Sequence, residues 1–187
     1  VGVPVVTDND ANVAAIGEFH TLKDSSPSSL LYVTISTGVG AGFVLDGKAV
    51  RGDQGLAGEL GHVDIGHTNE CSCGQRGCLE RAVSGYWIQN DHHVSAAEFL
   101  AAPANFDTWI DGLGKGLWTA VLMLDPALVV LGGGIAGQGS RLRQGLQEYF
   151  DRRSEAIGRF PPRVAMGDSS GRSVLLGAAL LTEEAFA

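Results

Sequence analysis

Three cysteines lie within eight residues of one another, at Cys71, Cys73 and Cys78, and the chain has no others. His62 lies nine residues upstream of the first. Three thiolates and one imidazole suit tetrahedral Zn²⁺, and a closed set of four ligands leaves no open position for catalysis. The odd number of cysteines argues against a disulfide framework. We therefore predict a structural zinc site made by the three cysteines and His62, with His67 as the alternative imidazole.

A polar pair, Asn9-Asp10, precedes a predicted helix over residues 11–20. Asn and Asp are common helix N-caps, and that role alone explains them. The other interpretation is catalytic, because a carboxylate that points out of a positively polarised helix end can accept a proton from a substrate hydroxyl. Asp10 is therefore a candidate general base, beside the plain capping role.

Glycine is about twice as frequent as usual, with 27 residues among 187, and it gathers in loops. Thr37 and Gly38 lie in a Ser-Thr-Gly-Val-Gly loop between two predicted strands, and Gly133 and Gly134 follow a buried one. Such loops let backbone N–H groups approach a phosphate or a nucleotide. A tight turn without a ligand requires the same glycines, so each loop by itself is a weak signal.

Two glutamates lie beside the predicted metal ligands. Glu59 precedes His62 by three residues, and Glu80 follows Cys78 by two. If the metal site forms, both carboxylates are held near it, and carboxylate and imidazole groups together suit hydrogen bonding to sugar hydroxyls. Taken singly, each glutamate is typical of a solvated surface.

The composition excludes several function classes. Thirteen basic and 21 acidic residues give a net charge of −8, and an acidic chain without a basic stretch is a poor candidate for binding nucleic acid through phosphates. The longest apolar run, residues 117–131, is interrupted by Asp125 and Pro126 and is too short to span a bilayer. No secretion signal opens the chain. We expect a cytoplasmic protein that makes no membrane contact.

The hydrophobic pattern predicts alternating elements. Strands are predicted at residues 3–7, 30–36, 40–45, 48–51, 127–131 and 163–166, and helices at 11–20, 79–89, 96–102, 106–124, 141–157 and 173–187. The turn Asp46-Gly47 is predicted to close the strand at residues 40–45. Strands joined by hairpins, followed by alternating strand and helix, predict an α/β fold with a mixed sheet and flanking helices.

Taken together, the motifs resemble those of the ROK family of bacterial sugar kinases and repressors. They are Asp8-Asn9-Asp10-Ala11-Asn12, Ser36-Thr37-Gly38-Val39-Gly40-Ala41-Gly42, Gly58-Glu59-Leu60-Gly61-His62 and Cys71-Ser72-Cys73-Gly74-Gln75-Arg76-Gly77-Cys78-Leu79-Glu80, in the family's order. The segment from Leu124 to Gly134 looks like the family's adenosine-side loop. The resemblance covers nearly the whole chain. It implies an actin-like ATPase (ribonuclease H-like) fold with a zinc-binding loop, in which ATP lies between two lobes.

The resemblance also implies a role for each site residue. Asp10 is the expected general base. The residues expected to hold the sugar are Asn9, Asp10, Glu59, His62 and Glu80. Thr37 and Gly38 are expected to face the phosphates, Gly133 and Gly134 the adenosine, and Mg²⁺ to accompany ATP. His62 would use one ring nitrogen for zinc and the other for a sugar hydroxyl, which favours it over His67.

The family's N-terminal lobe begins with a Gly-rich Asp-x-Gly-x-Thr loop that grips the phosphates, and no such loop opens this chain. We therefore expect residues 1–187 to be the C-terminal lobe of an ATP-dependent hexose or N-acylhexosamine kinase, without its phosphate-binding lobe and inactive alone. The alternatives are the sugar-sensing lobe of a ROK repressor and a zinc-stabilised interaction module. Family analogy predicts a homodimer.

Overall fold

The computed structural model describes residues 2–22 and 27–186. Its elements, in chain order, are α1 (Asp10–Thr21), β1 (Ser29–Ile35), β2 (Val39–Leu45), β3 (Lys48–Val50), η2 (Leu60–His62), α2 (Leu79–Val83), α3 (Gly85–His92), α4 (Ala96–Ala101), α5 (Pro103–Leu124), β4 (Leu128–Gly132), η3 (Gly134–Gln138), α6 (Gly139–Ala156), β5 (Arg163–Met166) and α7 (Arg172–Phe186). The labels η2 and η3 mark short 3₁₀ helices.

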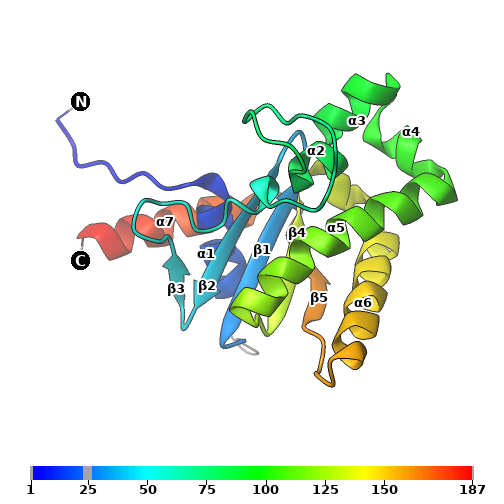
Figure 1. Cartoon of the computed structure of the whole chain (residues 1–187). Helices are drawn as coiled ribbons and strands as arrows, with labels where there is room; N and C mark the ends of the chain where they lie inside the picture. Colours follow the sequence, from blue (N-terminus) through cyan, green and yellow to red (C-terminus); the bar gives the residue numbers. More distant parts are fainter. Residues whose placement is uncertain (1, 23–26, 187) are drawn as a thin grey trace.

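The strands form one mixed sheet in the order β3-β2-β1-β4-β5. β1 pairs antiparallel with β2 and parallel with β4, which in turn pairs parallel with β5. Helices α1 and α7 cover one face of the sheet, and α5 and α6 cover the other (Figure 1). The predicted α/β class with a mixed sheet and flanking helices is confirmed.

β1 is buried on both faces, which explains the apolar run at residues 30–33. Leu31, Val33 and Ile35 enter the core on the α5 and α6 side, whereas Leu30 and Tyr32 enter the smaller core under α1. Successive side chains of a strand point to opposite faces. A strand with helices on both sides therefore favours apolar residues at successive positions.

Two of the predicted elements are wrong. The segment predicted as a strand over residues 3–7 forms no strand, because no neighbouring strand pairs with it within the described part of the chain, and Val3 and Val5 are exposed. The helix predicted over residues 79–89 is interrupted at Ser84. There, Gly85 and Tyr86 donate their backbone N–H groups to the carbonyls of the β1–β2 loop, and this tertiary pairing starts a new helix, α3, capped by Ser84.

Other boundaries shift by a few residues. α5 begins three residues earlier than predicted, because Pro103 occupies the first turn, where its missing N–H costs no hydrogen bond. The predicted Asp46-Gly47 turn joins β2 to β3, with both residues at positive φ, as expected for a tight hairpin.

Among the helices of residues 2–22 and 27–186, none combines the length and hydropathy that crossing a membrane requires.

Two glycines allow α1 and α7 to cross at close range. A side chain at Gly17 would collide with the backbone of Ser173, and one at Gly177 would collide with the carbonyl of Val13. The backbones can only approach this closely if both positions lack a Cβ atom. This contact supports α1, whose first turn carries Asn9 and Asp10.

Replacing Gly177 by alanine is expected to destabilise the chain by about 1–3 kcal/mol, because an extra methyl group in a packed contact forces the backbones apart. The loss is measured as a lower midpoint of urea unfolding. Gly137→Ala is the matched control, since a Cβ atom there meets no atom within 4 Å. Equal midpoints for the two variants would contradict the prediction.

Candidate active site and metal centre

The first half of β2 is the point where the predicted site segments meet. β3 pairs with β2 only from Phe43 onward, so the edge of β2 before that residue is open to other segments. A Cβ atom on Gly42 would lie 2.5 Å from the carbonyl oxygen of Ala11 in the first turn of α1. On the open edge, a Cβ atom on Gly61 would lie 2.5 Å from the carbonyl oxygen of Val39. β2 thus brings the start of α1 and the segment around η2 to one place.

Asn9 and Asp10 begin α1 at this place. The Asn9 side chain accepts the backbone N–H of Ala11 at 2.9 Å, so Asn9 is the N-cap. Asp10 is the first helical residue, and its side chain is exposed. Asn9 therefore has the capping role that was expected for this pair. The Asp10 carboxylate does not cap the helix and lies at its positively polarised end.

Glu59 and His62 bound the short helix η2. Glu59 is exposed and precedes η2, and His62 is its last residue. The chain turns tightly here because the Glu59 carbonyl accepts the His62 backbone N–H at 3.1 Å. Both side chains are therefore carried on one rigid turn beside the open edge of β2.

Glu80 contacts β2 from the far end of the segment from His62 to Glu80, which carries the three cysteines and is called the metal segment below. Its Oε2 accepts the backbone N–H of Val39 at 2.9 Å. It also lies 2.7 Å from where a Cβ atom on Gly38 would be. A residue predicted to hold sugar therefore contacts the loop predicted to face phosphate.

The residues predicted to face the nucleotide lie together beyond β1 and β4. Thr37 and Gly38 follow β1, and Gly133 follows β4, its parallel neighbour. Gly133 has φ +86°, and a side chain on it would collide with the carbonyl of Ile35, so only glycine fits there. Loops beyond the carboxyl ends of neighbouring parallel strands are a common place for nucleotides. Gly134 is close to the same turn, with Ser36 Oγ 3.5 Å from its Cβ position.

The cysteines and His62 come together as one cluster. The ligand atoms of His62, Cys71, Cys73 and Cys78 all lie within 4.8 Å of one another. Nδ1 of His62 is buried and has no hydrogen-bond partner among the described residues. His67 stays apart, and its Nδ1 accepts the backbone N–H of Asn69 at 3.2 Å.

The chemistry of this cluster fits a metal cation. The Sγ atoms of Cys73 and Cys78 are 3.6 Å apart. Burial, together with the neighbouring Cys73 and Cys71 thiols, raises the pKa of Cys78 to about 12. Thiolates packed this closely repel one another, and a bound cation removes that penalty. The orphaned His62 nitrogen completes a set of four donors, which suits a structural zinc ion.

Arg81 ties the metal segment to α2 and α3. Its Nε donates to the carbonyl of Glu70 at 3.1 Å, and its Nη1 donates to Asp91 at 2.7 Å. The guanidinium also stacks over the ring of Trp87, 4.1 Å from its centroid. Because Arg81 directly follows Glu80, these contacts also fix the backbone that carries Glu80.

The letters Asp-x-Gly-x-Thr do occur once in the chain, from Asp64 to Thr68. They lie inside the metal segment, where Asp64 forms an isolated bridge with Cys78 and its side chain accepts the N–H of Gly66 at 2.8 Å. They belong to the metal segment and not to a strand-linked phosphate loop.

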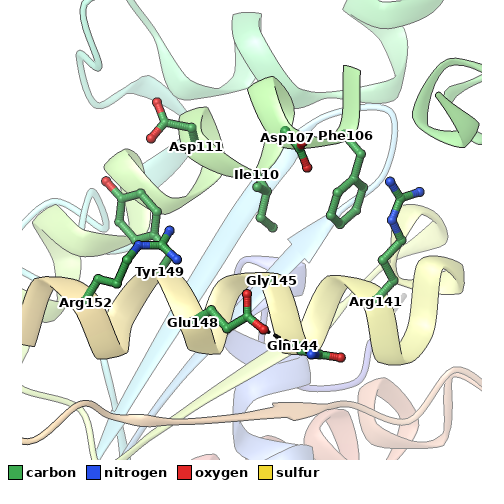
Figure 2. A pocket seen from close by; sticks show the side chains of 10 residues that line it. All are labelled: Phe106, Asp107, Ile110, Asp111, Arg141, Gln144, Gly145, Glu148, Tyr149 and Arg152. Atoms are coloured by element: carbon green, nitrogen blue, oxygen red, sulfur yellow. Dashed lines mark hydrogen bonds between the residues drawn. The ribbon is translucent and has the colours of Figure 1, made fainter. Parts of the chain in front are cut away.

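A groove of 450 Å³ lies between α5 and α6, away from these residues (Figure 2). Asp107, Asp111 and Glu148 give it an acidic rim, and Arg141 and Arg152 stand at its two ends. None of its ten lining residues belongs to the predicted sites.

Asp8 and Arg51 are site neighbours that the sequence analysis did not single out. The Nε of Arg51 donates to Oδ2 of Asp8 at 2.7 Å, directly before the Asn9-Asp10 pair. The available signal for Arg51 was a lone basic residue at the end of a predicted strand, before a glycine-rich loop, and it has no specificity without the fold.

The fold and these loops define a class: an α/β chain with the actin-like ATPase fold and a Cys/His cluster. The chain belongs to the ROK family, whose model matches residues 1–185. The N-acetylmannosamine kinase of Vibrio cholerae is 33% identical over 198 residues, which cover 97% of this chain and 66% of the kinase. The chain thus spans slightly less than two thirds of that relative's length.

Solved structures agree with this membership. The ROK hexokinase of Thermus thermophilus is 33% identical, with a TM-score of 0.87, over all of this chain and 68% of the other. A ROK glucokinase of Streptomyces griseus, solved with glucose and AMPPNP, is 27% identical, with a TM-score of 0.78, over 98% and 70%. A ROK transcriptional regulator, a homologue of the E. coli MLC protein, is 25% identical, with a TM-score of 0.80, over 97% and 52%.

Proposed function

We propose that this chain is the C-terminal, sugar-binding lobe of a kinase that transfers the γ-phosphoryl group of ATP to a hydroxyl of a hexose or N-acylhexosamine. One observation carries the proposal. Two segments meet along the first half of β2, one carrying Asn9 and Asp10 and the other carrying Glu59 and His62. Glu80 holds the backbone of the same stretch. A carboxylate base beside polar side chains that can bind hydroxyls suits sugar activation.

In this proposal, Asp10 accepts the proton of the attacking hydroxyl as the hydroxyl oxygen bonds to the γ-phosphorus. The bond from that phosphorus to the bridging β-phosphate oxygen breaks, and ADP leaves. Asn9, Glu59 and His62 bind other hydroxyls, with Glu80 beside them, and fix which one faces Asp10. Phosphoryl transfer depends mainly on such positioning and on electrostatic stabilisation. The exposed Asp10 carboxylate at a helix start supports its role as base.

The nucleotide side is assigned to the two loops beyond β1 and β4. The backbone of Thr37 and Gly38 faces the phosphates, and Gly133 and Gly134 face the adenosine. Mg²⁺ accompanies ATP and neutralises charge on its phosphates. The closeness of Gly38 and Val39, in the loop after β1, to Glu80 supports a transfer path from nucleotide to sugar over the start of β2.

Zinc is assigned a structural role. It would be held by Cys71, Cys73, Cys78 and Nδ1 of His62, and it would keep the segment between His62 and Glu80 folded. The other His62 nitrogen, Nε2, then remains for the sugar. The buried Nδ1 without a partner supports this division of the imidazole.

The substrate class follows from the relatives. One acts on N-acetylmannosamine and another is a hexokinase, which supports a hexose or N-acylhexosamine as substrate. We also propose that the protein is cytoplasmic and forms homodimers, by analogy with the family, and that this chain does not bind nucleic acid.

A second candidate is the sugar-sensing lobe of a ROK repressor, which the similarity to the transcriptional regulator favours. The two candidates share the sugar site and differ in chemistry. A sensor needs no base, so the Asn9-Asp10 pair favours the kinase. A zinc-stabilised interaction module without a ligand is the third candidate, and detection of sugar binding by calorimetric titration would exclude it.

The chain by itself is expected to have no appreciable kinase activity, because ATP and Mg²⁺ would meet only one wall of the cleft. Weak sugar binding is expected to remain, since the proposed sugar residues all lie on this chain. An ADP-release assay with a panel of hexoses and N-acylhexosamines, combined with calorimetric titration of the same sugars, measures both. Turnover of about 1 s⁻¹ or more, ordinary for a kinase, would contradict the half-site assignment.

The complete two-lobed protein is the positive control in the same assay. ATP-dependent phosphorylation of one of the sugars supports the kinase. Sugar binding without phosphorylation supports the repressor candidate, and the absence of sugar binding removes both.

A further inference from the structure

Arg51 stands between the two segments that bear the proposed sugar residues. Its side chain reaches back to Asp8, where Nε donates to Oδ2 at 2.7 Å. Its backbone carbonyl accepts the N–H of Ala57 at 3.2 Å. One residue therefore contacts both the chain before α1 and the loop that leads to Glu59.

Asp8 transmits this contact to the start of α1. Its Oδ1 accepts the backbone N–H of Asn9 at 2.8 Å and the side-chain amide of Asn12 at 3.0 Å. The carboxylate is only 7% exposed, whereas the Arg51 side chain is 36% exposed. Both carboxylate oxygens of Asp8 therefore accept hydrogen bonds. The donors to Oδ1 are Asn9, which directly precedes α1, and Asn12 in its first turn.

The ionised form of Asp8 is strongly favoured. Burial by itself raises the pKa of this carboxyl group, but the hydrogen bonds from Asn12, Arg51 and Asn9 outweigh burial and hold the pKa below its usual value. A charged hydrogen-bonded pair of this kind is shorter and stronger than a neutral one. The connection therefore persists at neutral pH.

The other end of the connection is the loop after β3. The backbone N–H of Ala57 donates to the carbonyl of Arg51, and the N–H of Glu59 donates to the carbonyl of Leu56 at 3.3 Å. The loop is consequently closed at Arg51 and delivers Glu59 and His62 to the edge of β2. The Arg51 side chain therefore adds a hydrogen-bonded link between the start of α1 and this loop to the packing of both segments against β2.

We propose that Arg51 is a positioning residue that sets the Asn9-Asp10 helix start relative to the Glu59–His62 turn, acting through Asp8. This inference rests on the proposed sugar-kinase function for its catalytic consequence. The base and the residues that bind hydroxyls come from segments about fifty positions apart in the sequence. A small error in their spacing misaligns the attacking hydroxyl, and a misplacement of about 1 Å can cost on the order of 10²-fold in rate.

The test uses the complete protein with Arg51→Ala, Asp8→Asn and the double variant. We expect Arg51→Ala to lower kcat by about 10- to 100-fold with the KM for ATP unchanged, because geometry is lost and the nucleotide contacts are kept. If Arg51 acts through Asp8, the double variant is no slower than the slower single variant. Effects that multiply would show that Arg51 acts directly, and unchanged turnover in Arg51→Ala would show that it does not position the site; either result overturns the proposal.

Amide hydrogen exchange provides a readout that does not depend on kinase activity. We expect Arg51→Ala to speed exchange in residues 8–13, which lose the side-chain contact at Asp8, and in residues 52–59, whose backbone anchor at position 51 is then no longer held by Asp8, with little change elsewhere. Lys115→Ala is the matched control, because it removes a cation from an exposed ion pair with Asp111 on α5. Loosening of only one segment, or of neither, overturns the proposal.

Failure of the proposed kinase function and failure of the positioning role of Arg51 give different results. If the wild-type protein phosphorylates no sugar, the proposed function fails, and the exchange experiment still decides whether Arg51 couples the two segments. If the wild-type protein is active and Arg51→Ala is equally active, only the positioning role fails.

Discussion

Replacing Asp10 by asparagine in the complete protein is expected to lower kcat by about 10²–10⁴-fold, the usual contribution of a general base. The change is nearly isosteric, and Asp10 lies at the first helical position, where the N-cap contact belongs to its neighbour Asn9. The fold and much of the sugar affinity are therefore expected to remain. Steady-state kinetics with the best sugar of the panel, together with calorimetric sugar binding, measure the two effects separately.

Asp107→Asn is the matched control for this experiment, because Asp107 is an exposed aspartate on α5, outside the proposed site. Its turnover is expected to equal that of the wild type. A normal kcat in Asp10→Asn would remove Asp10 from the mechanism. The kinase assignment would stand in that case, because the variant would still phosphorylate sugar, and another group would have to act as the base.

Loss of the zinc ion is expected to unfold the segment from residue 61 to residue 80 and to abolish sugar binding. Structural zinc contributes on the order of 10–16 kcal/mol of apparent binding energy in small zinc domains, and that energy is folding energy. His62 and Glu80 lie near the two ends of this segment, so both lose their positions when it unfolds. We expect about one zinc ion per chain by elemental analysis of protein purified without added metal.

Cys78→Ser tests the same prediction without a chelator, since Cys78 is fully buried. We expect it to lower zinc content, melting temperature and sugar affinity together. Gln75→Ala is the control, because Gln75 lies in the same loop, is exposed and is not one of the four clustered donors. A folded, metal-free wild-type protein with an unchanged melting temperature would contradict a structural role for zinc.

The pattern of apolar residues was sufficient to predict most of the sheet. Residues 30–33 of β1 and the whole of β4 are apolar runs because each strand is buried on both faces, and hydrophobic burial is the dominant driving force in folding. The Asp46-Gly47 turn was also readable, because few residue pairs adopt positive φ at both positions. Family membership followed from motifs whose order and spacing are specific, and it is confirmed.

The local hydrophobic pattern failed to predict secondary structure where contacts with distant parts of the chain decide it. The helix predicted across Ser84 breaks because the carbonyls of Ser36 and Thr37 capture the next two amides. The apolar residues 3–7 have strand propensity, but a strand also needs a partner edge, and none reaches them within the described chain. Neither outcome is encoded within a window of ten residues.

The sequence by itself determined which chemistry is available: four donors suited to zinc, a carboxylate at a helix start, and glycines where backbone must come close. These properties depend on residue type and short spacing, which are fixed along the chain. Only the tertiary structure decided which groups meet. The pairing of β2 with β1, and the early end of β3 opposite Phe43, leave one open edge on β2. Segments far apart in sequence gather around that stretch of β2 because each strand hydrogen-bonds in a single register, and the sequence alone does not show which register that is.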